Sequence, residues 1–384
     1  MKTDKKWMSG LISLALLAFL LAGCAPAAAP TATPTKAAPA AATPAGGTAK
    51  PATTAAASTP AAQAKPTSAP VTVRFASPGT LSDAGVYIAL EKGYFKELGV
   101  DLKIETVQSA ATAIAPLAAG DLEVAGGVIS TAFLNAIDRG VAMKAVATKG
   151  GAIKGFDASQ MIIRKDLIDS GQVKEVKDLK GKTLSLANVQ SGAEAESAQF
   201  LKQGGLTIKD VNLVVMGYSD QLVAFGNKAI DMGIQNEPLI TTAVEQGLAV
   251  KWAPGAFSTF YGGEYQVAAL QLSQAFAKNT DGARRFMVAY VKGLRDYNDA
   301  FVKGKDKAAI ITILTKYTSQ KDPAMYSKME MSYLHPDGRL HLPSMQLDFD
   351  YFKQMGYYTG KLELKDIVDT QFTDYAVQQL GAYK

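Results

Sequence analysis

The chain is poor in the side chains that most enzymes use for acid–base or covalent chemistry. Its 384 residues include one cysteine, Cys24, and two histidines, His335 and His341. A single cysteine excludes an intrachain disulfide and leaves no cysteine nucleophile. The two histidines stand in a turn-rich stretch without a third ligand, which indicates a surface turn rather than a metal site. No nucleophile elbow, phosphate-binding loop or metalloprotease helix is present. We therefore expect no catalysis, no metal and no cofactor.

The N-terminus also lacks an apolar run long enough to cross a bilayer, which needs about 20 residues. The apolar residues 11–21 follow a lysine-rich start and precede small residues, as in a secretory signal peptide. Residues 21–24, Leu-Ala-Gly-Cys, resemble the lipobox of bacterial lipoproteins. We expect residues 1–23 to be removed and Cys24 to carry lipid, which would hold the protein on the extracytoplasmic face of the cell membrane.

Residues 24–70 lack Leu, Ile, Val and aromatic side chains and consist mainly of Ala, Pro, Thr, Ser and Gly. Such a segment cannot form a core, and its prolines favour an extended, hydrated backbone, so we interpret it as a tether. The signal contributes two and the tether three of the five net positive charges, which leaves residues 71–384 neutral. A neutral folded part argues against nucleic-acid binding.

From Val71 onward, short β-branched runs alternate with helical stretches. We expect strands at 71–75, 101–106, 122–125 and 143–147, separated by helices at 83–92, 110–119 and 130–140. After a glycine-rich break at 150–151, we expect strands at 161–163, 183–187, 211–216, 231–234 and 250–253, helices at 192–203, 219–227 and 238–246, and a return strand at 266–272. This order predicts an α/β protein with two mostly parallel sheets flanked by helices.

The remaining residues have the pattern of helices. One long helix carries an apolar stripe at helical spacing, which we assign to the core: Phe286, Tyr290, Leu294, Tyr297 and Phe301. The folded part exceeds the size of a single core, so two lobes are expected. We divide the chain into lobe 1 (71–158 plus 266–384) and lobe 2 (159–265), with crossovers near 155–162 and 262–270. Two such sheets facing each other would form a cleft that closes by a hinge.

Several segments resemble a known family. Residues 88–100 (IALEKGYFKELGV) and 117–126 (LAAGDLEVAG) resemble the opening of periplasmic binding proteins for sulfonates, taurine, nitrate and the thiamine pyrimidine precursor. Residues 178–183 (DLKGKT), 229–231 (AID) and 237–238 (EP) resemble second-lobe signatures of the same superfamily. The resemblance covers essentially all of residues 71–384. It implies the type II bilobed periplasmic-binding-protein fold and delivery of a small solute to the permease and ATPase subunits of an ABC importer.

The resemblance also implies which turns line the ligand cleft. The candidate ligand-binding residues are Ser77, Asp83, Tyr87, Gly127, Ser130, Ser191, Asn236, Glu237, Tyr261 and Tyr265. Each has a structural alternative: for example, Ser130 can cap a helix, and Pro238 can begin one. The sequence Ser191-Gly192-Ala193-Glu194 predicts a capping box. Glu194 and Glu196 place negative charge in the first turn of this helix, where they would compete with an anionic ligand.

Lysine and arginine are scarce in these turns, whereas aromatic residues are frequent. The aromatic candidates in the lining and crossover regions are Tyr87, Phe156, Tyr218, Trp252, Phe257, Phe260, Tyr261 and Tyr265. Flat rings offer stacking surfaces, which favours a flat heterocyclic solute. With its lipid-linked tether, the chain is similar to the riboflavin-binding component of a riboflavin importer, so riboflavin is our first expectation. The thiamine pyrimidine precursor, sulfonates, taurine and nitrate are the alternatives.

Two other classes of protein remain open. The same fold occurs in a thiamine-pyrimidine synthase, so fold alone does not exclude an enzyme. That synthase consumes a histidine and carries clustered cysteines, which this chain lacks. An adhesion or scaffolding lipoprotein would need the same anchor and tether, but it predicts no closable cleft and no bound solute.

Overall fold

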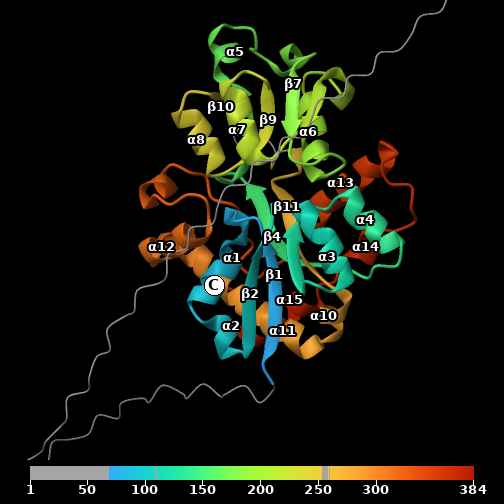
Figure 1. Ribbon diagram of the computed structural model, residues 1–384, viewed down its shortest axis with the longest axis vertical. Helices are drawn as coiled ribbons and strands as arrows, with labels where there is room; N and C mark the ends of the chain where they lie inside the picture. The colour runs from blue at the N-terminus through green and yellow to red at the C-terminus, as the bar shows by residue number, and fades with distance from the viewer. Residues whose placement is uncertain (1–68, 109, 253–257, 259) are drawn as a thin grey trace, which may run out of the picture. The chain divides into compact units, whose positions relative to one another are not determined.

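The computed structural model describes residues 69–108, 110–252, 258 and 260–384. Within these residues the strands form two sheets, one of six strands and one of five (Figure 1). The first has the order β2-β1-β3-β11-β4-β5, with β1 (Val71–Ser77), β2 (Val100–Thr106), β3 (Val124–Gly127), β4 (Lys144–Ile153), β5 (Phe156–Asp157) and β11 (Glu264–Leu272). The second has the order β10-β6-β9-β7-β8, with β6 (Ser159–Arg164), β7 (Thr183–Leu186), β8 (Asn212–Val215), β9 (Met232–Asn236) and β10 (Ala249–Lys251). Lobe 1 and lobe 2 below mean the first and the second sheet, each with its own helices.

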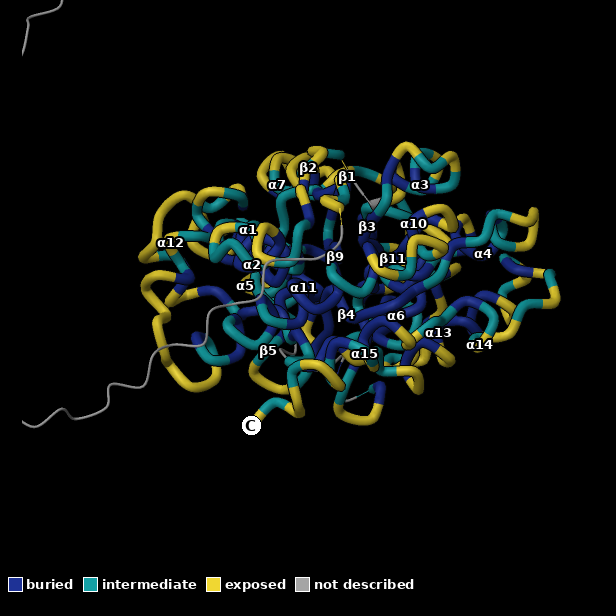
Figure 2. Tube along the Cα trace, turned by 90° about the horizontal axis from the view of Figure 1, so that it is seen from below, coloured by how far each residue is buried: buried dark blue, intermediate teal, exposed yellow. Residues whose placement is uncertain are grey.

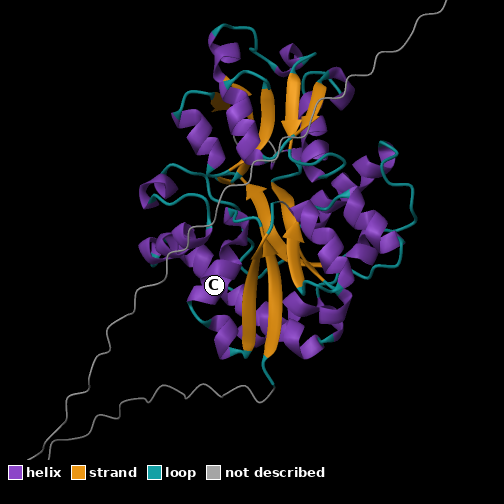
Figure 3. Cartoon of the chain, in the orientation of Figure 1, coloured by secondary structure: helices purple, strands orange, loops and turns teal. Residues whose placement is uncertain are grey.

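Helices flank both sheets (Figure 3). Lobe 1 has α1 (Ala84–Glu91), α2 (Tyr94–Glu97), α3 (Ile114–Ala119), α4 (Thr131–Asp138), α10 (Gln274–Lys278), α11 (Thr280–Phe301), α12 (Lys307–Tyr317), α13 (Leu342–Gln354), α14 (Leu364–Ile367) and α15 (Gln371–Leu380). Lobe 2 has α5 (Lys165–Asp169), α6 (Gly192–Lys202), α7 (Tyr218–Gly226) and α8 (Leu239–Glu245). The α/β class that we expected from the alternation is confirmed.

Both sheets are mixed rather than mostly parallel. In lobe 1, β1 pairs in parallel with β2 and β3, whereas β11 runs antiparallel to β3 and β4. In lobe 2, β7 pairs in parallel with β8 and β9, whereas β6 runs antiparallel to β9 and β10. The strands β6 and β11 are the ones that the chain enters on passing from one sheet to the other. Their direction is therefore set by the crossing and not by a βαβ connection.

The predicted apolar stripe of the long helix forms the centre of lobe 1. Phe286, Tyr290 and Leu294 of α11 are fully buried and pack against α1, which lies beside α11 although about 200 residues separate the two in sequence (Figures 1 and 2). The approach of the two helices is close at Gly293, where a Cβ atom would lie 2.1 Å from the carbonyl oxygen of Gly85. Only glycine therefore fits this crossing.

The glycine pair at 150–151 does not break the chain, as the sequence suggested, but continues β4. Both residues are buried in the ladder between β4 and β11. A Cβ at Gly150 would lie 3.1 Å from Ser82 Cβ, and one at Gly151 would lie 2.9 Å from the carbonyl oxygen of Tyr265. The glycines are therefore explained by close packing on the strand and not by a turn.

Candidate functional site

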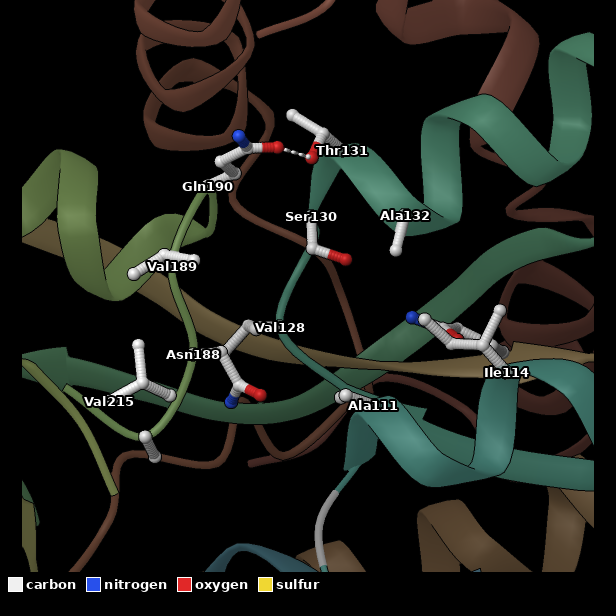
Figure 4. A pocket seen from close by; sticks show the side chains of 13 residues that line it. Ala111, Ile114, Val128, Ser130, Thr131, Ala132, Asn188, Val189, Gln190 and Val215 are labelled. Carbon is white, nitrogen blue, oxygen red and sulfur yellow. Dashed lines mark hydrogen bonds between the residues drawn. The ribbon is translucent and has the colours of Figure 1, made fainter. Parts of the chain in front are cut away.

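Two strand-to-helix turns, one from each lobe, line a pocket of about 290 Å³ (Figure 4). One turn joins β3 to α4 and the other joins β7 to α6. The lining residues are Ala111, Ile114, Gly127, Val128, Ser130, Thr131, Ala132, Ala187, Asn188, Val189, Gln190, Val215 and Gln271. Apolar side chains predominate, and no residue of this described lining carries a charge. The pocket lies at the carboxyl ends of parallel strands, where α/β sheets commonly bind ligands.

Backbone hydrogen bonds join the two turns beside the pocket. The amide of Thr131 donates to the carbonyl of Gln190 (3.1 Å), and the amide of Gly192 donates to the carbonyl of Ile129 (3.3 Å). The Thr131 hydroxyl also donates to the side-chain oxygen of Gln190 (3.1 Å; dashed line in Figure 4). The two lobes are therefore in direct contact beside the pocket.

Four hydrogen-bond donors of the pocket lack an acceptor among the described residues. Ser130 caps α4 by accepting from the amide of Phe133 (3.4 Å), which leaves the hydroxyl proton free to donate. The backbone N–H of Ala132, in the first turn of α4, is unpaired there, and so are the side-chain amides of Asn188 and Gln271. These uncharged donors lie among apolar side chains. They suit a ligand that has a hydrogen-bond-accepting head group and an apolar part.

The start of α6 differs from the predicted capping box. The Ser191 hydroxyl donates to the carbonyl of Asn188 (3.0 Å) and does not cap the helix. The carboxylate of Glu194 accepts from the backbone amide of Gln190 (2.7 Å) and from the hydroxyl of Tyr351 (3.1 Å). The reciprocal box fails because the Ser191 side chain turns back into its own loop. Glu194 still places a carboxylate at the N-terminus of α6, and its competition with an anionic ligand stays a prediction.

The candidates Ser77, Asp83 and Tyr87 meet in the interior of lobe 1. The Ser77 hydroxyl donates to Asp83 Oδ2 (2.8 Å) and lies 2.6 Å from the hydroxyl of Tyr87. Asp83 is fully buried and forms an ion pair with Lys149, Nζ to Oδ1 at 2.9 Å. Burial and the neighbouring Asp83 raise the pKa of Tyr87. None of the three lines the pocket, and their part in binding stays a prediction.

Asn236 and Glu237 stand at the end of β9, next to α8. The buried carboxylate of Glu237 accepts from the backbone amide (3.0 Å) and the hydroxyl (2.9 Å) of Thr241, and Lys251 lies 3.5 Å away. The amide of Asn236 donates to the side-chain oxygen of Gln235 (2.9 Å). These contacts stabilise the start of α8. Neither residue lines the pocket, and a direct ligand contact of either one is likewise only predicted.

Tyr261 and Tyr265 converge on a carboxyl group that the sequence did not single out. Their hydroxyls donate to Asp348 Oδ1 (2.9 Å) and Oδ2 (3.1 Å), and their ring centroids are 4.2 Å apart. Burial raises the pKa of Asp348 to about 8, against the lowering effect of the two tyrosine hydroxyls. The two tyrosines are buried with Ala152 and do not line the pocket. A part for them in ligand binding stays a prediction as well.

The aromatic residues therefore do not form the wall on which we based the riboflavin expectation. Tyr87 stacks on Tyr317 at 4.7 Å, and Trp252 and Phe260 pack on the core of lobe 2. The described lining of the pocket contains no aromatic side chain. Phe257 lies outside the described residues. Of the ten candidates, only Gly127 and Ser130 line the pocket, and Ser191 pairs with Ser130 beside it.

Sequence reasoning missed three residues that shape these sites, namely Gln271, Lys149 and Asp348. Gln271 lies on β11, 144 positions after Gly127, and faces the same pocket. Lys149 falls between the strand expected at 143–147 and the glycine-rich break, and Asp348 falls in the tail that we expected to be helical. No local pattern marks any of them, because their partners come from distant parts of the chain. Only the structure shows that Lys149 is a charged residue within a buried strand, β4.

The predicted lipidation site, Cys24, and the tether lie outside the described residues. Among the described residues, no helix combines the length and the apolar character that a membrane span requires. His335 and His341 form local contacts. His335 Nδ1 accepts from the amide of Asp337 (3.1 Å), and His341 Nδ1 lies 3.0 Å from the Ser344 hydroxyl. In the part of the chain that the structure describes, no group of acidic, histidine or cysteine residues could hold a metal ion.

Residues 81–299 match the protein family described as NMT1/THI5 like. No curated protein sequence matches the chain. The fold is similar to that of the alkanesulfonate-binding protein SsuA from Xanthomonas axonopodis pv. citri, bound to MOPS (TM-score 0.63, 14% identity, covering 79% of this chain and 99% of that one). It is also similar to the ligand-binding component of an ABC-type import system from Staphylococcus aureus (TM-score 0.65, 14% identity, covering 80% of this chain and 99% of that one). A third similar structure is the nitrate-binding protein NrtA from Synechocystis PCC 6803 (TM-score 0.64, 13% identity, covering 81% of this chain and 89% of that one). These likenesses establish the periplasmic-binding-protein fold.

Proposed function

The chain belongs to the NMT1/THI5-like family, and from this premise we propose that it is the extracytoplasmic solute-binding component of an ABC importer. It captures a small solute between its two lobes and delivers the solute to a permease. The observation that carries this proposal is the shared pocket: the β3–α4 turn of lobe 1 and the β7–α6 turn of lobe 2 line one cavity of about 290 Å³. A catalytic role would need reactive groups in that cavity, and its described lining is uncharged.

We propose an amphipathic solute with a hydrogen-bond-accepting head group, such as a short alkanesulfonate. The Ala132 N–H, the Ser130 hydroxyl and the Gln271 amide are donors for the head group. The first of these belongs to a helix N-terminus, where oxyanions bind favourably. Val128 and Val215 provide apolar surface for the tail. Riboflavin is the weaker choice because its ring system would need stacking partners in the pocket.

The objection that Glu194 and Glu196 would repel an anion is weaker than the sequence suggested. Glu194 lies at the start of α6, where it is bound by the Gln190 amide and Tyr351, whereas the proposed anion would occupy the start of α4. Glu196 is buried away from solvent, and burial raises its pKa well above the ordinary value. This shift favours the neutral form of Glu196, which does not oppose an anionic solute.

Isothermal titration tests this proposal on full-length protein carrying Cys24→Ala, which prevents lipidation. We expect butanesulfonate to bind, and taurine, nitrate, riboflavin and the thiamine pyrimidine precursor serve as competitors in the same assay. Ser130→Ala and Gln271→Ala should each weaken binding about tenfold, because each removes a hydrogen bond to a charged group. Gln378→Ala, an exposed amide on α15, is the matched control and should bind like the wild type. Tight riboflavin binding with no sulfonate binding would overturn the choice of solute.

We further propose that Cys24 carries lipid and that residues 24–70 tether the receptor to the cell membrane. The support is the lipobox-like sequence and the apolar-free segment that follows it. We also propose that residues 71–158 with 266–384 and residues 159–265 move as two bodies about the crossovers. Labelling of expressing cells with an alkyne fatty acid should mark the wild type but not Cys24→Ala, and the variant should leave the membrane fraction. Membrane retention of unlabelled Cys24→Ala would contradict the anchor.

A further inference from the structure

The interface between α13 and α6 buries carboxyl groups from both lobes. Phe349 and Phe352 of α13 belong to the core of lobe 1, whereas Phe200 and Leu201 of α6 belong to the core of lobe 2. At the first residue of α6, Gly192, a Cβ atom would lie 3.0 Å from Asp348 Oδ2 and 2.9 Å from the Tyr265 hydroxyl. No larger residue than glycine fits there without movement.

Glu196 follows Gly192 by four positions, so both lie on the same face of α6, the face toward α13. Its side chain is 2% exposed, and its Oε1 atom has no hydrogen-bond partner. Asp157, at the crossover from β5 to β6, is fully buried, and its Oδ2 atom is unpaired as well. The carboxyls of Asp157 and Asp348 both act electrostatically on Glu196. Buried carboxyl groups from both lobes therefore influence one another electrostatically where the lobes join.

Little positive charge compensates this cluster. In the described part of the chain, neither Asp348 nor Glu196 takes part in an ion pair. Lys251 of β10 lowers the pKa of Asp157, but it is already paired with Glu237 at 3.5 Å and with Glu330 at 3.2 Å. The negative charge of Glu330 raises the pKa of Asp157 and so opposes the effect of Lys251. The other titratable groups that face the cluster are acidic or phenolic: Tyr218 of α7, Tyr261 and Tyr265 before and in β11, and Tyr351 with its partner Glu194.

Burial without a cation favours the neutral form of a carboxyl group. Burial is the largest effect at all three sites: it raises the pKa of Asp157 to about 7 and that of Asp348 to about 8, and it raises the pKa of Glu196 well above its ordinary value. Burial therefore favours the protonated forms of these groups while the lobes are in contact. Separation of α6 from α13 would expose Asp348 and Glu196 to water, where carboxyl groups ionise with a pKa of about 4.

We propose that closure of the lobes is coupled to proton uptake by Asp348 and Glu196, so that the receptor closes on its solute more readily as pH falls. This inference rests on the proposed function, because it assumes that the lobes separate and close around a solute. The sign follows from linkage: the closed form binds more protons than the open form, so acid favours closure. Each fully linked proton changes the solute affinity by up to about tenfold per pH unit in the range between the open and closed pKa values.

The experiment is titration calorimetry of the full-length Cys24→Ala protein with butanesulfonate, near neutral pH, in buffers of different ionisation enthalpy. We expect net proton uptake on binding and an affinity that weakens as pH rises. Glu196→Gln with Asp348→Asn should abolish both effects. Asp350→Asn is the control, because this exposed residue lies on the same helix, α13, and should leave proton uptake unchanged. Since the double variant could fail to fold, proton uptake by the wild type itself is the deciding measurement.

Two ligand-free measurements separate this inference from the proposed function. Infrared spectra of the wild type near neutral pH should contain the band of protonated carboxyl groups, and small-angle scattering should show a more compact protein at lower pH. Binding without proton uptake would overturn the inference and leave the receptor function standing. If no solute binds, but the band and the compaction are present in the wild type, the coupling stands and the proposed function fails. If neither binding nor the two ligand-free signals are observed, both proposals fail.

Discussion

Replacing Lys149 by methionine should destabilise the protein strongly because it leaves Asp83 buried without its cation. Lys149 and Asp83 have side chains that are 3% and 0% exposed, and Nζ lies 2.9 Å from Oδ1. At this distance and an effective dielectric constant of about 20, the attraction is about 6 kcal/mol before desolvation. Removal of one partner of a buried pair typically costs about 3–5 kcal/mol. Methionine keeps the apolar stem that Lys149 lays across Gly126.

The loss is measurable by urea unfolding and by calorimetry. With an unfolding entropy of about 2.1 cal/mol/K per residue over the 309 residues that the structure describes, a cost of about 3–5 kcal/mol lowers Tm by about 5–8 °C. Lys165→Met is the matched control, since its ion pair with Asp169 is exposed (43% and 58%), and it should cost less than about 1 kcal/mol. Asp83→Asn added to Lys149→Met should recover much of the stability, because the remaining amide keeps the Ser77 hydroxyl as a partner. Additive losses in the double variant would refute the claim that a buried ion pair carries the effect.

Three further predictions concern packing and pH. Gly293→Ala places a methyl group 2.1 Å from the Gly85 carbonyl oxygen and should cost about 1–3 kcal/mol in urea unfolding. The control Gly226→Ala, whose methyl meets nothing closer than 4.0 Å, should be neutral or slightly stabilising; equal losses in both would contradict the packing argument. Gly192→Ala should push α6 away from α13 and weaken closure, seen as a larger radius of gyration in scattering, and an unchanged radius would argue against this interface. Because the folded pKa of Asp348 is raised to about 8, stability should be highest in mild acid. The free energy of unfolding should fall by about 1.4 kcal/mol per pH unit as pH rises from about 5 toward that pKa. Asp348→Asn should reduce this pH dependence, and a free energy of unfolding that does not change with pH in the wild type would contradict the prediction.

The periodicity of the sequence was sufficient for the class of fold. The apolar stripe of Phe286, Tyr290 and Leu294 predicted a buried helix, and these side chains are fully buried in α11. The ends of the helices expected at 83–92 and 110–119 were also readable, since the glycines that follow them, Gly93 and Gly120, adopt left-handed backbone conformations (φ +77° and +81°). These features depend on residues within a few positions of one another, so local spacing contains the information.

The direction of the strands was not readable in the same way. Apolar runs such as β6 and β11 look alike whether their neighbours are parallel or antiparallel. Gly150 and Gly151 gave the pattern of a turn, yet they lie in β4 because Ser82 and the Tyr265 backbone leave no room for a side chain. The spatial neighbours of a residue decided both outcomes, and those neighbours lie far away in the sequence.

The sequence by itself determined the signal-like N-terminus, the apolar-free segment, the neutral folded part and the positions of the turns that follow the strands. Only the tertiary structure decided which of those turns meet. It brought Ser130 to Ser191 across the lobes, paired Asp83 with Lys149, and placed Asp348 against the first turn of α6. Burial then changed the chemistry of these groups, since the free energy of a charge depends on the water and the partners around it, which residue order alone does not specify.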